Sequence, residues 1–478
     1  MDDKKIKWIV IAGVMGVSVL TAFWDLTGRA IGNHEAYVGV AARNMVSSGD
    51  WVVPMFNGKA RLNKTPLCYW LTAAAAKITG GVNDFTVRLP GAALAVLSAI
   101  AIFYFISDQL GFRTGALSAI IWSTSFCYIR YSHTGRPEMA LTAFVAVAML
   151  SFYSAVQASS HRKQIYCMLV FWISFSLAML AKGPAPLPLI IPAIFFYFVV
   201  YRKWKLVPKL LPIAGVILFL LIVLPWPIAI LKGEPTALTV WKNEFLGRAT
   251  GEYASGGQPC YYYFTVIFVH FLPFSAFIPF AFAAPFYRIW EEKRDAISYQ
   301  WLWFFAGIAA MTVCGGKRPH YILPIMPAMA VLTGIILDDM IFARKVYNRR
   351  LARNFLAAYI VVFLMGLCVF FFVRPGIEDK EADENLVIRD LAQKSAAAAI
   401  DKPIIAYCKV NESFIYYFNK NVPVLCNIDE VYAEYVKGDG VIASGEKFEQ
   451  LKKDGRFRLL ITGLDSGRGL FVKNAMSE

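Results

Sequence analysis

The segment NHEAYVGVAARNMVSSGDWVVPMFNGKARLNKTPL (residues 33–67) is polar, yet it separates an apolar span at residues 6–25 from a long series of others. A loop of this length in a chain otherwise made of membrane spans is usually functional or disordered. The apolar and polar residues alternate from Ala36 to Met45 as in an amphipathic helix at a membrane surface, which favours order over a solvated connector. The candidate functional side chains of this loop are His34, Glu35, Arg43, Asp50, Arg61 and Lys64.

The composition is that of an integral membrane protein, because 58% of the 478 residues are hydrophobic, 15% are aromatic and the mean hydropathy is +0.51. In a soluble chain the net charge of +15 would suggest binding to nucleic acid. Lys and Arg accumulate in the cytoplasmic loops of membrane proteins, however. The charge is therefore explained by a lipid bilayer, and we expect no nucleic acid as partner.

Eleven apolar runs are long enough to cross roughly 30 Å of hydrocarbon. They lie near residues 6–25, 88–110, 114–131, 138–157, 165–181, 185–201, 207–230, 262–287, 299–314, 321–341 and 353–373. The first is too long for the core of a signal peptide, so we expect a retained helix. The Ala-rich run Cys68–Ile78 predicts a re-entrant or surface helix, with two further crossings nearby as the alternative. The prediction is a multi-spanning α-helical membrane protein with about 11–13 transmembrane helices.

The charges of the loops predict the orientation of these helices. With the N-terminus in the cytoplasm, every inside loop carries Lys or Arg, as the positive-inside rule requires. The same orientation places every unusual polar segment outside. We therefore predict a transmembrane domain at residues 1–374, with an extracytoplasmic first loop at 26–87, and an extracytoplasmic domain at 375–478.

The C-terminal segment has the composition of a small soluble α/β domain of about one hundred residues. The runs PIIAYC, VPVLC, DGVIAS, FRLLITG and GLFVKN predict strands, and Asn411–Phe418, Asp429–Val436 and Lys447–Lys453 predict helices. No Gly-rich phosphate loop is present, so we expect this domain to serve in packing or in contacts with an acceptor. Of eight cysteines only Cys408 and Cys426 lie here, and they would pair if the domain faces an oxidising space.

Two ionisable side chains lie at the ends of predicted membrane helices. Glu138 in GRPEMALTAF is a functional candidate because charges so close to hydrocarbon are costly, and local pairing with Arg136 is the alternative. Lys182 in AKGPAPLP precedes several prolines, which would free backbone groups to line a cavity. Snorkelling of Lys182 to the interface is the competing explanation.

Further cations occur in two outer loops. Arg248 lies in WKNEFLGRATGEY, and Lys317 and Tyr321 lie in GGKRPHYILP. Cations beside a tyrosine hydroxyl at the bilayer surface suit a phosphate with a lipid tail. Anchoring at the membrane interface explains any one of these residues. It explains less well why so many cations lie on the extracytoplasmic side, where the positive-inside rule expects few.

These motifs together resemble the bacterial polyprenyl-phosphate-dependent glycosyltransferases, namely the aminoarabinose transferases of lipid A and their relatives, which are kin to protein O-mannosyltransferases with the GT-C fold. The resemblance lies in HEAYVGVAARNMVSSGDWVVPMFNGKARLNKTPLCYWL, NDFTVRLPGA, RPEM, LAKGP, EFLGR, YYY and KRPHYILPIMP, and it covers roughly residues 1–340. It implies a cavity in the membrane, open to the outside, where a sugar leaves a lipid phosphate carrier. It also implies location in the bacterial inner membrane.

The resemblance assigns roles to individual cations. Lys64 stands in the place of the family's Lys-Pro-Pro lysine and would contact the donor phosphate, although Thr65 replaces the first proline. Arg248 and Tyr321 match positions expected to hold the same phosphate, and Lys182 matches a cavity lysine.

The resemblance also points to an acid pair. Relatives commonly have Asp-Glu where this chain has His34-Glu35, and their first acid is favoured as catalytic. Because His34 occupies that first place, Glu35 is our candidate for the base. Glu138 matches a second acidic position.

The expected chemistry needs cations more than an acid, since a polyprenyl phosphate is already a reasonable leaving group. Lys64 and Arg248 would stabilise the charge that develops on it. One carboxylate would act as base and contribute ~10²–10⁴-fold, and direct displacement with one base implies inversion at the anomeric carbon. Alternatively, His34, Glu35 and Glu138 ligate a divalent metal, and the spacing does not decide between these roles.

We therefore predict an enzyme that moves a sugar from a polyprenyl-phosphate-linked donor to an extracytoplasmic acceptor, which is a glycolipid such as lipid A, a polysaccharide or a protein. A transporter or lipid-carrier flippase is the alternative. It is disfavoured because no inverted repeat is visible and few charges lie in mid-helix. A third possibility is a non-catalytic assembly subunit, in which Lys64 and Glu35 would tolerate replacement.

Overall fold

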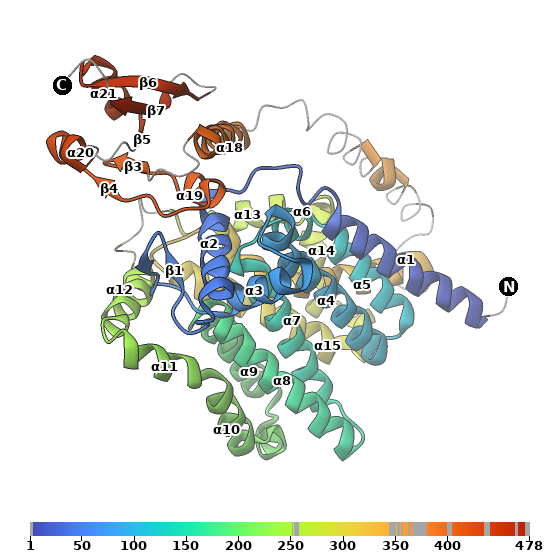
Figure 1. The fold of residues 1–478 in the computed structure, drawn as a ribbon. Helices are drawn as coiled ribbons and strands as arrows, with labels where there is room; N and C mark the ends of the chain where they lie inside the picture. The colour runs from blue at the N-terminus through green and yellow to red at the C-terminus, as the bar shows by residue number, and fades with distance from the viewer. Residues whose placement is uncertain are drawn as a thin grey trace. The chain divides into compact units, whose positions relative to one another are not determined.

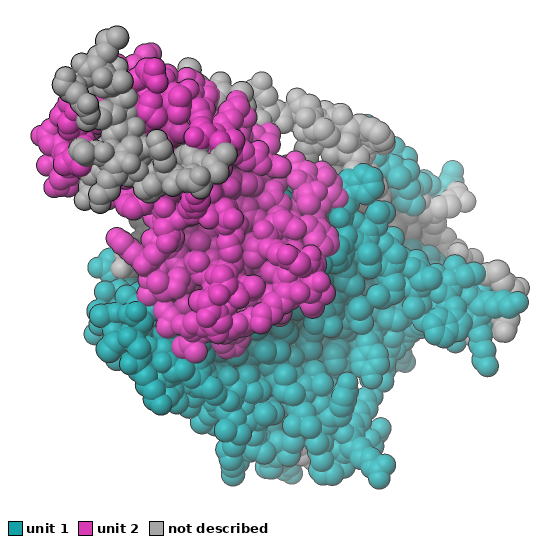
Figure 2. All heavy atoms as spheres, in the orientation of Figure 1, with its two compact units in different colours: residues 1–24, 62–68, 88–374 teal, residues 25–61, 69–87, 375–478 magenta. Residues whose placement is uncertain are grey.

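The computed structural model describes residues 3–250, 252, 258–343, 350, 354, 357–361, 364–365, 380–398, 404–434, 440–463 and 467–473. The chain divides into two compact units, coloured separately in Figure 2. Unit one comprises residues 1–24, 62–68 and 88–374, and unit two comprises residues 25–61, 69–87 and 375–478. The first loop and the C-terminal segment thus belong to one compact unit.

Helices dominate the chain through residue 343 (Figure 1). In order, the elements are α1 (Asp3–Phe23), α2 (Asn33–Ser48), β1 (Met55–Phe56), β2 (Lys59–Ala60), α3 (Leu67–Thr79), α4 (Asp84–Leu110), α5 (Phe112–Thr124), α6 (Phe126–Ser132), α7 (Pro137–Val156), α8 (His161–Lys182), α9 (Leu187–Tyr201), η1 (Trp204–Leu210), α10 (Pro212–Val223), α11 (Pro225–Gly233), α12 (Ala237–Thr250), α13 (Tyr262–His270), η2 (Phe274–Phe277), α14 (Ile278–Ala283), η3 (Ala284–Phe286), η4 (Arg288–Lys293), α15 (Arg294–Val313), η5 (Pro319–Ile325), α16 (Met326–Asp338) and η6 (Asp339–Ala343).

Within the described residues, seven helical segments are long and apolar enough to cross a membrane. They are Lys4–Phe23, Asp84–Leu110, Pro137–Val156, His161–Lys182, Pro212–Gly233, Trp290–Val313 and Pro319–Phe342. At 1.5 Å per residue even the shortest is about 30 Å long, which matches the hydrocarbon core. The prediction of a multi-spanning helical membrane protein is confirmed, and none of these segments lies between residues 24 and 83.

Within the described residues, four predicted spans are not single helices. The run 207–230 covers η1, α10 and α11, and the run 321–341 covers η5, α16 and η6. The run 114–131 is interrupted at Ser125, whose extended backbone (φ −71°, ψ 146°) ends α5 and begins α6. The run 262–287 is divided into α13, η2, α14 and η3, because Pro273, Pro279 and Pro285 lack the N–H that a continuous helix needs. The predicted span 353–373 falls largely outside the described residues.

Some polar side chains inside unit one form hydrogen bonds between helices, which lowers the cost of placing them in hydrocarbon. The Trp122 indole N–H donates to the Ser98 hydroxyl at 2.7 Å, and the Tyr299 hydroxyl donates to the Met149 carbonyl at 2.7 Å. Each bond joins two different helices. These contacts fix neighbouring helices where dispersion alone would leave their register loosely defined.

Unit two contains a five-stranded sheet with the order β4-β3-β5-β7-β6. Its elements are α18 (Lys380–Ala398), β3 (Ile404–Tyr407), α19 (Glu412–Phe418), β4 (Val424–Leu425), α20 (Ile428–Glu434), β5 (Gly440–Ser444), α21 (Glu446–Lys453), β6 (Phe457–Thr462) and β7 (Arg468–Lys473). β3 pairs in parallel with β4 and β5, whereas β7 is antiparallel to β5 and β6. The predicted α/β fold, with its five strands and three helices, is confirmed.

The patterns of the sequence do not predict α18, which is rich in alanine and charged residues. Its buried residues Ile388, Leu391, Ala392 and Ser395 recur at helical spacing on one face. This face packs in a core cluster that includes Ile404 of β3. The helix therefore covers one side of the sheet.

The amphipathic helix predicted at Ala36–Met45 is α2, and it packs on α19. Both terminal nitrogens of Arg43 donate to the Tyr416 carbonyl at 3.1 Å. The Tyr416 ring lies so close to Gly39 that an added Cβ would be 2.5 Å from its Cε2 atom. A second anchor is the β1–β2 turn, where Asn57 exchanges two hydrogen bonds with the Val422 backbone at 2.8 and 2.7 Å. The first loop is thus an ordered part of unit two.

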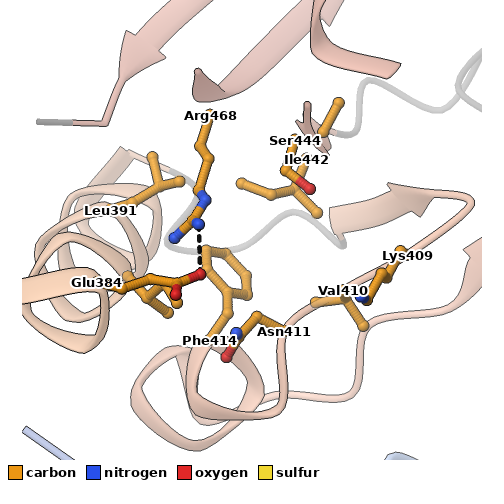
Figure 3. A pocket seen from close by; sticks show the side chains of 11 residues that line it. Glu384, Leu391, Lys409, Val410, Asn411, Phe414, Ile442, Ser444 and Arg468 are labelled. Carbon is orange, nitrogen blue, oxygen red and sulfur yellow. Dashed lines mark hydrogen bonds and ion pairs between the residues drawn. The ribbon is translucent and has the colours of Figure 1, made fainter. Parts of the chain in front are cut away.

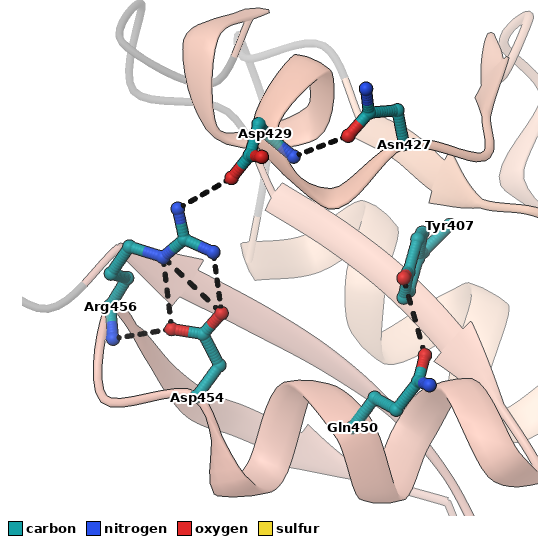
Figure 4. A network of polar contacts seen from close by, with 6 residues as sticks. All are labelled: Tyr407, Asn427, Asp429, Gln450, Asp454 and Arg456. Atoms are coloured by element: carbon teal, nitrogen blue, oxygen red, sulfur yellow. Dashed lines mark hydrogen bonds and ion pairs between the residues drawn. The ribbon is translucent and has the colours of Figure 1, made fainter.

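An ion pair network ties α20 to the turn before β6 (Figure 4). Arg456 donates to Asp454 at 2.8 Å and to Asp429 at 3.0 Å, and this lowers the pKa of the Asp454 carboxyl. Cys408 and Cys426 directly follow the neighbouring strands β3 and β4 but are thiols in this structure. Each sulfur lies near the other residue's carbonyl oxygen, at 3.6 and 3.8 Å.

Candidate functional site

Glu35 lies in the first turn of α2 and is only 7% exposed. Its Oε2 atom accepts a hydrogen bond from the N–H of Gly32, the residue that caps the helix, at 3.2 Å. This is the carboxylate half of a capping box, and the helix N-terminus favours its ionised form. The neighbouring His34 side chain is exposed. The chain thus holds Glu35 as an oriented carboxylate.

Tyr417 of α19 anchors the backbone immediately before Glu35. Its hydroxyl accepts from the Ile31 N–H at 2.7 Å and donates to Asp84 at 2.9 Å. The Ser413 hydroxyl also donates to the side chain of Asn33, at 3.1 Å. Residues that follow α2 by nearly 400 positions in the sequence therefore fix the start of this helix.

Tyr37 and Arg61 form a second ordered pair in unit two. The Tyr37 hydroxyl donates to Glu412 at 2.6 Å, and the Arg61 guanidinium lies 3.4 Å from the centre of the Tyr37 ring. Arg61 also donates to the Tyr69 hydroxyl at 3.2 Å. Burial and the Glu412 carboxylate raise the pKa of Tyr37 to about 12, so it remains a hydrogen-bond donor at neutral pH.

In unit one, three basic side chains surround Glu138, which is 4% exposed. The Lys182 ammonium is 3.1 Å from its Oε1 atom, His320 Nε2 is 3.5 Å from the same oxygen, and Arg136 Nε is 3.4 Å from Oε2. We call these four residues the Glu138 cluster. The local pairing with Arg136 is present, and two residues distant in the sequence join it, while the functional role of Glu138 stays a prediction. A carboxylate held by two permanent cations is a weak proton acceptor and a strong anchor.

Lys182 is aimed at this cluster by the turn that ends α8. Gly183 has φ 59° and ψ −140°, and an added Cβ would lie 2.6 Å from the ring of Phe245. Only glycine fits such a conformation at such a close approach. The Lys182 ammonium also lies 5.3 Å from the centre of the Tyr321 ring, a cation–π distance. The structure therefore brings together the predicted residues Glu138, Lys182 and Tyr321.

Lys64 is held by α12. Its ammonium pairs with Glu244 at 2.5 Å, and the Trp241 indole donates to the Leu62 carbonyl at 2.7 Å. Arg248 lies one turn after Glu244 in the same helix, and its side chain is outside the described part of the chain. Lys317 is half-buried and makes no ion pair with a described residue.

Sequence reasoning missed Glu244 and Tyr417. The i, i+4 spacing of Glu244 and Arg248 on a helix was a usable signal, whereas nothing local marks Tyr417. Among the described residues, no three His, Cys, Asp or Glu side chains gather closely enough to hold a metal ion. Geometry therefore adds nothing to the hypothesis that His34, Glu35 and Glu138 bind a divalent metal.

Known proteins resemble this chain in sequence. A family model described as dolichyl-phosphate-mannose-protein mannosyltransferase matches residues 63–228. An uncharacterized protein of Aquifex aeolicus is 31% identical over 71% of this chain and 65% of its own length. The undecaprenyl phosphate-alpha-4-amino-4-deoxy-L-arabinose arabinosyl transferase of Edwardsiella ictaluri is 28% identical over 67% of this chain and 59% of its own length. The chain thus spans less than two thirds of either relative.

Solved structures resemble it in fold. ArnT from Cupriavidus metallidurans, solved bound to undecaprenyl phosphate, superposes with a TM-score of 0.81 at 18% identity, over 98% of both chains. The oligosaccharyltransferase of Archaeoglobus fulgidus gives a TM-score of 0.59 at 13% identity, over 92% of this chain and 70% of that one. The chain is a multi-pass membrane protein with the GT-C fold, the fold that it shares with ArnT.

Proposed function

We propose that the protein transfers a sugar from a polyprenyl-phosphate-linked donor to an acceptor outside the cytoplasm. The acceptor is a glycolipid such as lipid A, a polysaccharide or a protein. The observation that carries the proposal is a fold shared almost end to end with ArnT, a protein solved with undecaprenyl phosphate bound. The cations at the ends of the membrane helices give the proposal its chemistry, since a lipid phosphate needs such partners.

In the proposed step, an acceptor hydroxyl oxygen bonds to the anomeric carbon of the sugar. The bond from that carbon to the phosphate oxygen breaks, and the polyprenyl phosphate leaves with the electron pair. The hydroxyl proton passes to the Glu35 carboxylate, which Gly32 orients through one oxygen. One displacement inverts the anomeric configuration. We assign the base to Glu35 rather than Glu138, because Lys182 and Arg136 already neutralise Glu138.

We assign the donor phosphate to Lys64, Lys182, Arg248, Lys317 and Tyr321. The Lys64 side chain is 37% exposed despite its pairing, so a ligand phosphate can reach it. Glu244 would then act as a placeholder that the donor phosphate displaces. Fixed cations of this kind stabilise the charge of the leaving group without rearranging during the reaction.

A transporter or flippase fits less well. The residues of the Glu138 cluster sit in the first turn of α7, in the last turn of α8 and at the start of η5, which are helix ends. Transporters place their coupling charges near the middle of the bilayer. Relatives in sequence from Edwardsiella ictaluri and Pseudomonas fluorescens are named as arabinosyl transferases.

Lys64→Ala should weaken donor binding by about tenfold or more, because losing a charge-assisted contact costs ~1.5–3 kcal/mol. Glu244→Gln should bind donor at least as well as the wild type, since it removes the competitor for Lys64. Lys242→Ala, which removes an exposed lysine from the same helix, is the matched control. Donor affinity can be measured by native mass spectrometry. Weaker binding in Glu244→Gln, or unchanged binding in Lys64→Ala, would refute the assignment.

Tyr417→Phe should lower kcat about two- to tenfold with the donor affinity and KM unchanged, because one hydrogen bond that positions the start of α2 is lost. Tyr416→Phe is the matched control: its hydroxyl also reaches Asp84, at 3.3 Å, but not Ile31. Steady-state kinetics separates kcat from KM. If both variants lose the same activity, Tyr417 acts on the stability of unit two and not on Glu35.

We propose that the N-terminus is cytoplasmic and that residues 375–478 form an extracytoplasmic domain of a bacterial inner-membrane protein. An alkaline phosphatase fused after Glu478 should therefore be active, and a fusion between α7 and α8, at Ala158, should be inactive. The loop charges support this arrangement. Activity at Ala158 with none after Glu478 would reverse the orientation.

The proposed function is tested by extracting the purified protein and identifying the lipid that accompanies it by mass spectrometry. A sugar linked to a polyprenyl phosphate is the expected companion. Ordinary phospholipids alone, from a preparation that was supplied with the donor lipid, would contradict the proposal.

A further inference from the structure

A cavity of about 120 Å³ lies in the α/β part of unit two (Figure 3). The polar side chains at its rim are Glu384, Lys409, Asn411, Ser444 and Arg468. None of them belongs to the proposed catalytic or donor-binding residues. The cavity is smaller than the roughly 300–1,000 Å³ of pockets for drug-sized ligands, so any ligand that it holds is small.

The topology of the sheet explains why the cavity is there. β3 lies between β4 and β5 and is parallel to both. The chain leaves β3 through α19 to reach β4 on one side, and it returns through α20 to β5 on the other side. In open α/β sheets, ligands bind in the crevice that such a reversal leaves at the carboxyl ends of the strands.

Three separate segments deliver polar side chains to this crevice. Lys409 and Asn411 follow the carboxyl end of β3, and Ser444 is the last residue of β5. Arg468 begins β7 and is the register partner of Ser444, so the antiparallel pairing brings it to the same edge. The cavity therefore draws on both the parallel and the antiparallel halves of the sheet.

The charges at the rim favour an anion. Arg468 pairs with Glu384 at 2.5 Å within the lining of the cavity, and Lys409 makes no ion pair with a described residue. Two cations thus face one carboxylate. Part of the lining is apolar, since Phe414 and Ile442 belong to the buried core of unit two. A ligand with an anionic group and a ring whose C–H face can lie on an apolar surface matches this combination.

We propose that this cavity binds a phosphorylated sugar, with the phosphate against Lys409 and Arg468 and the ring over Phe414. The hydroxyls of the ring would meet Asn411, Ser444 and Glu384. The same chemistry is offered by a free sugar phosphate and by the phosphorylated head group of a glycolipid. Only the second source rests on the proposed function, because such a glycolipid would be an acceptor.

The first arm of the test measures binding alone. Full-length protein in nanodiscs of a zwitterionic lipid is titrated with glucosamine 1-phosphate and with glucosamine, and binding is followed by calorimetry. The phosphate should strengthen binding, and Lys409→Ala should weaken it about tenfold, as expected for one charge-assisted contact. Lys452→Ala, which removes an exposed lysine of α21 in the same domain, should have no effect. Equal binding of the two sugars, or equal effects of the two variants, would overturn the proposal.

The second arm distinguishes the sources. If the ligand is a head group, nanodiscs that contain a phosphorylated glycolipid should reduce the binding of glucosamine 1-phosphate, and Lys409→Ala should raise the KM for that acceptor without changing donor affinity. If the ligand is free, the glycolipid should not compete. Binding of glucosamine 1-phosphate in a protein that transfers no sugar would contradict the proposed function and still support the cavity. Sugar transfer by a protein that does not bind glucosamine 1-phosphate would support the proposed function and contradict the cavity proposal.

Discussion

Glu35→Gln is expected to abolish sugar transfer while the protein still folds and binds its donor. The substitution keeps the shape of the side chain, and the amide oxygen can still accept the hydrogen bond from the Gly32 N–H, so the helix cap survives. What is lost is the negative charge that accepts a proton. General base catalysis contributes ~10²–10⁴-fold, so the rate should fall by about that factor. Transfer is measured with a labelled donor, and folding is checked by thermal unfolding.

His34→Gln is the matched comparison, because His34 is exposed, lies next to Glu35 and can also accept a proton near neutral pH. It should reduce transfer only partly. An active Glu35→Gln together with an inactive His34→Gln would mean that the base occupies the first position of the pair, and our assignment would be wrong.

The second large effect is expected on stability. Lys182→Ala removes the closest cation from the buried Glu138 carboxylate. Breaking a buried ion pair typically costs ~3–5 kcal/mol, and we expect the lower end of this range because Arg136 and His320 remain. The melting temperature of the purified protein should therefore fall clearly.

The double variant Lys182→Ala/Glu138→Gln shows whether the loss of stability comes from the unpaired Glu138 charge or from lost packing of Lys182. If the loss comes from an uncompensated charge, neutralising Glu138 should recover most of the stability. Lys163→Ala is the control, since it breaks an exposed pair with Asp108 that is worth only ~0–1 kcal/mol. A double variant no more stable than Lys182→Ala would show that the lysine acts by packing and not through Glu138.

The sequence predicted what depends on local patterns. Apolar length predicted most of the membrane helices, and alternation predicted α2 and the strands of the sheet. The prediction from sequence failed where a single residue interrupts a helix, as Ser125 does between α5 and α6. It also failed for α18, a helix rich in alanine and charged residues.

The candidate site could be predicted only in part, because its contacts join distant segments. Glu138 was a candidate by itself, but its meeting with Lys182 and His320 depends on how three helices pack. The pairing of Lys64 with Glu244 likewise spans 180 residues. The role of Tyr417 follows from the folding of the C-terminal domain with the first loop, which no local pattern encodes.

The central claim is that the bond between the sugar and the lipid phosphate is broken and a new glycosidic bond is made. The most direct test reconstitutes the protein in liposomes with a polyprenyl-phosphate-linked sugar and a glycolipid acceptor, and counts both products by mass spectrometry. We predict one free polyprenyl phosphate for each glycosylated acceptor, and neither product with Glu35→Gln. Movement of the intact donor across the bilayer, with no polyprenyl phosphate released, would contradict a transferase and identify a transporter.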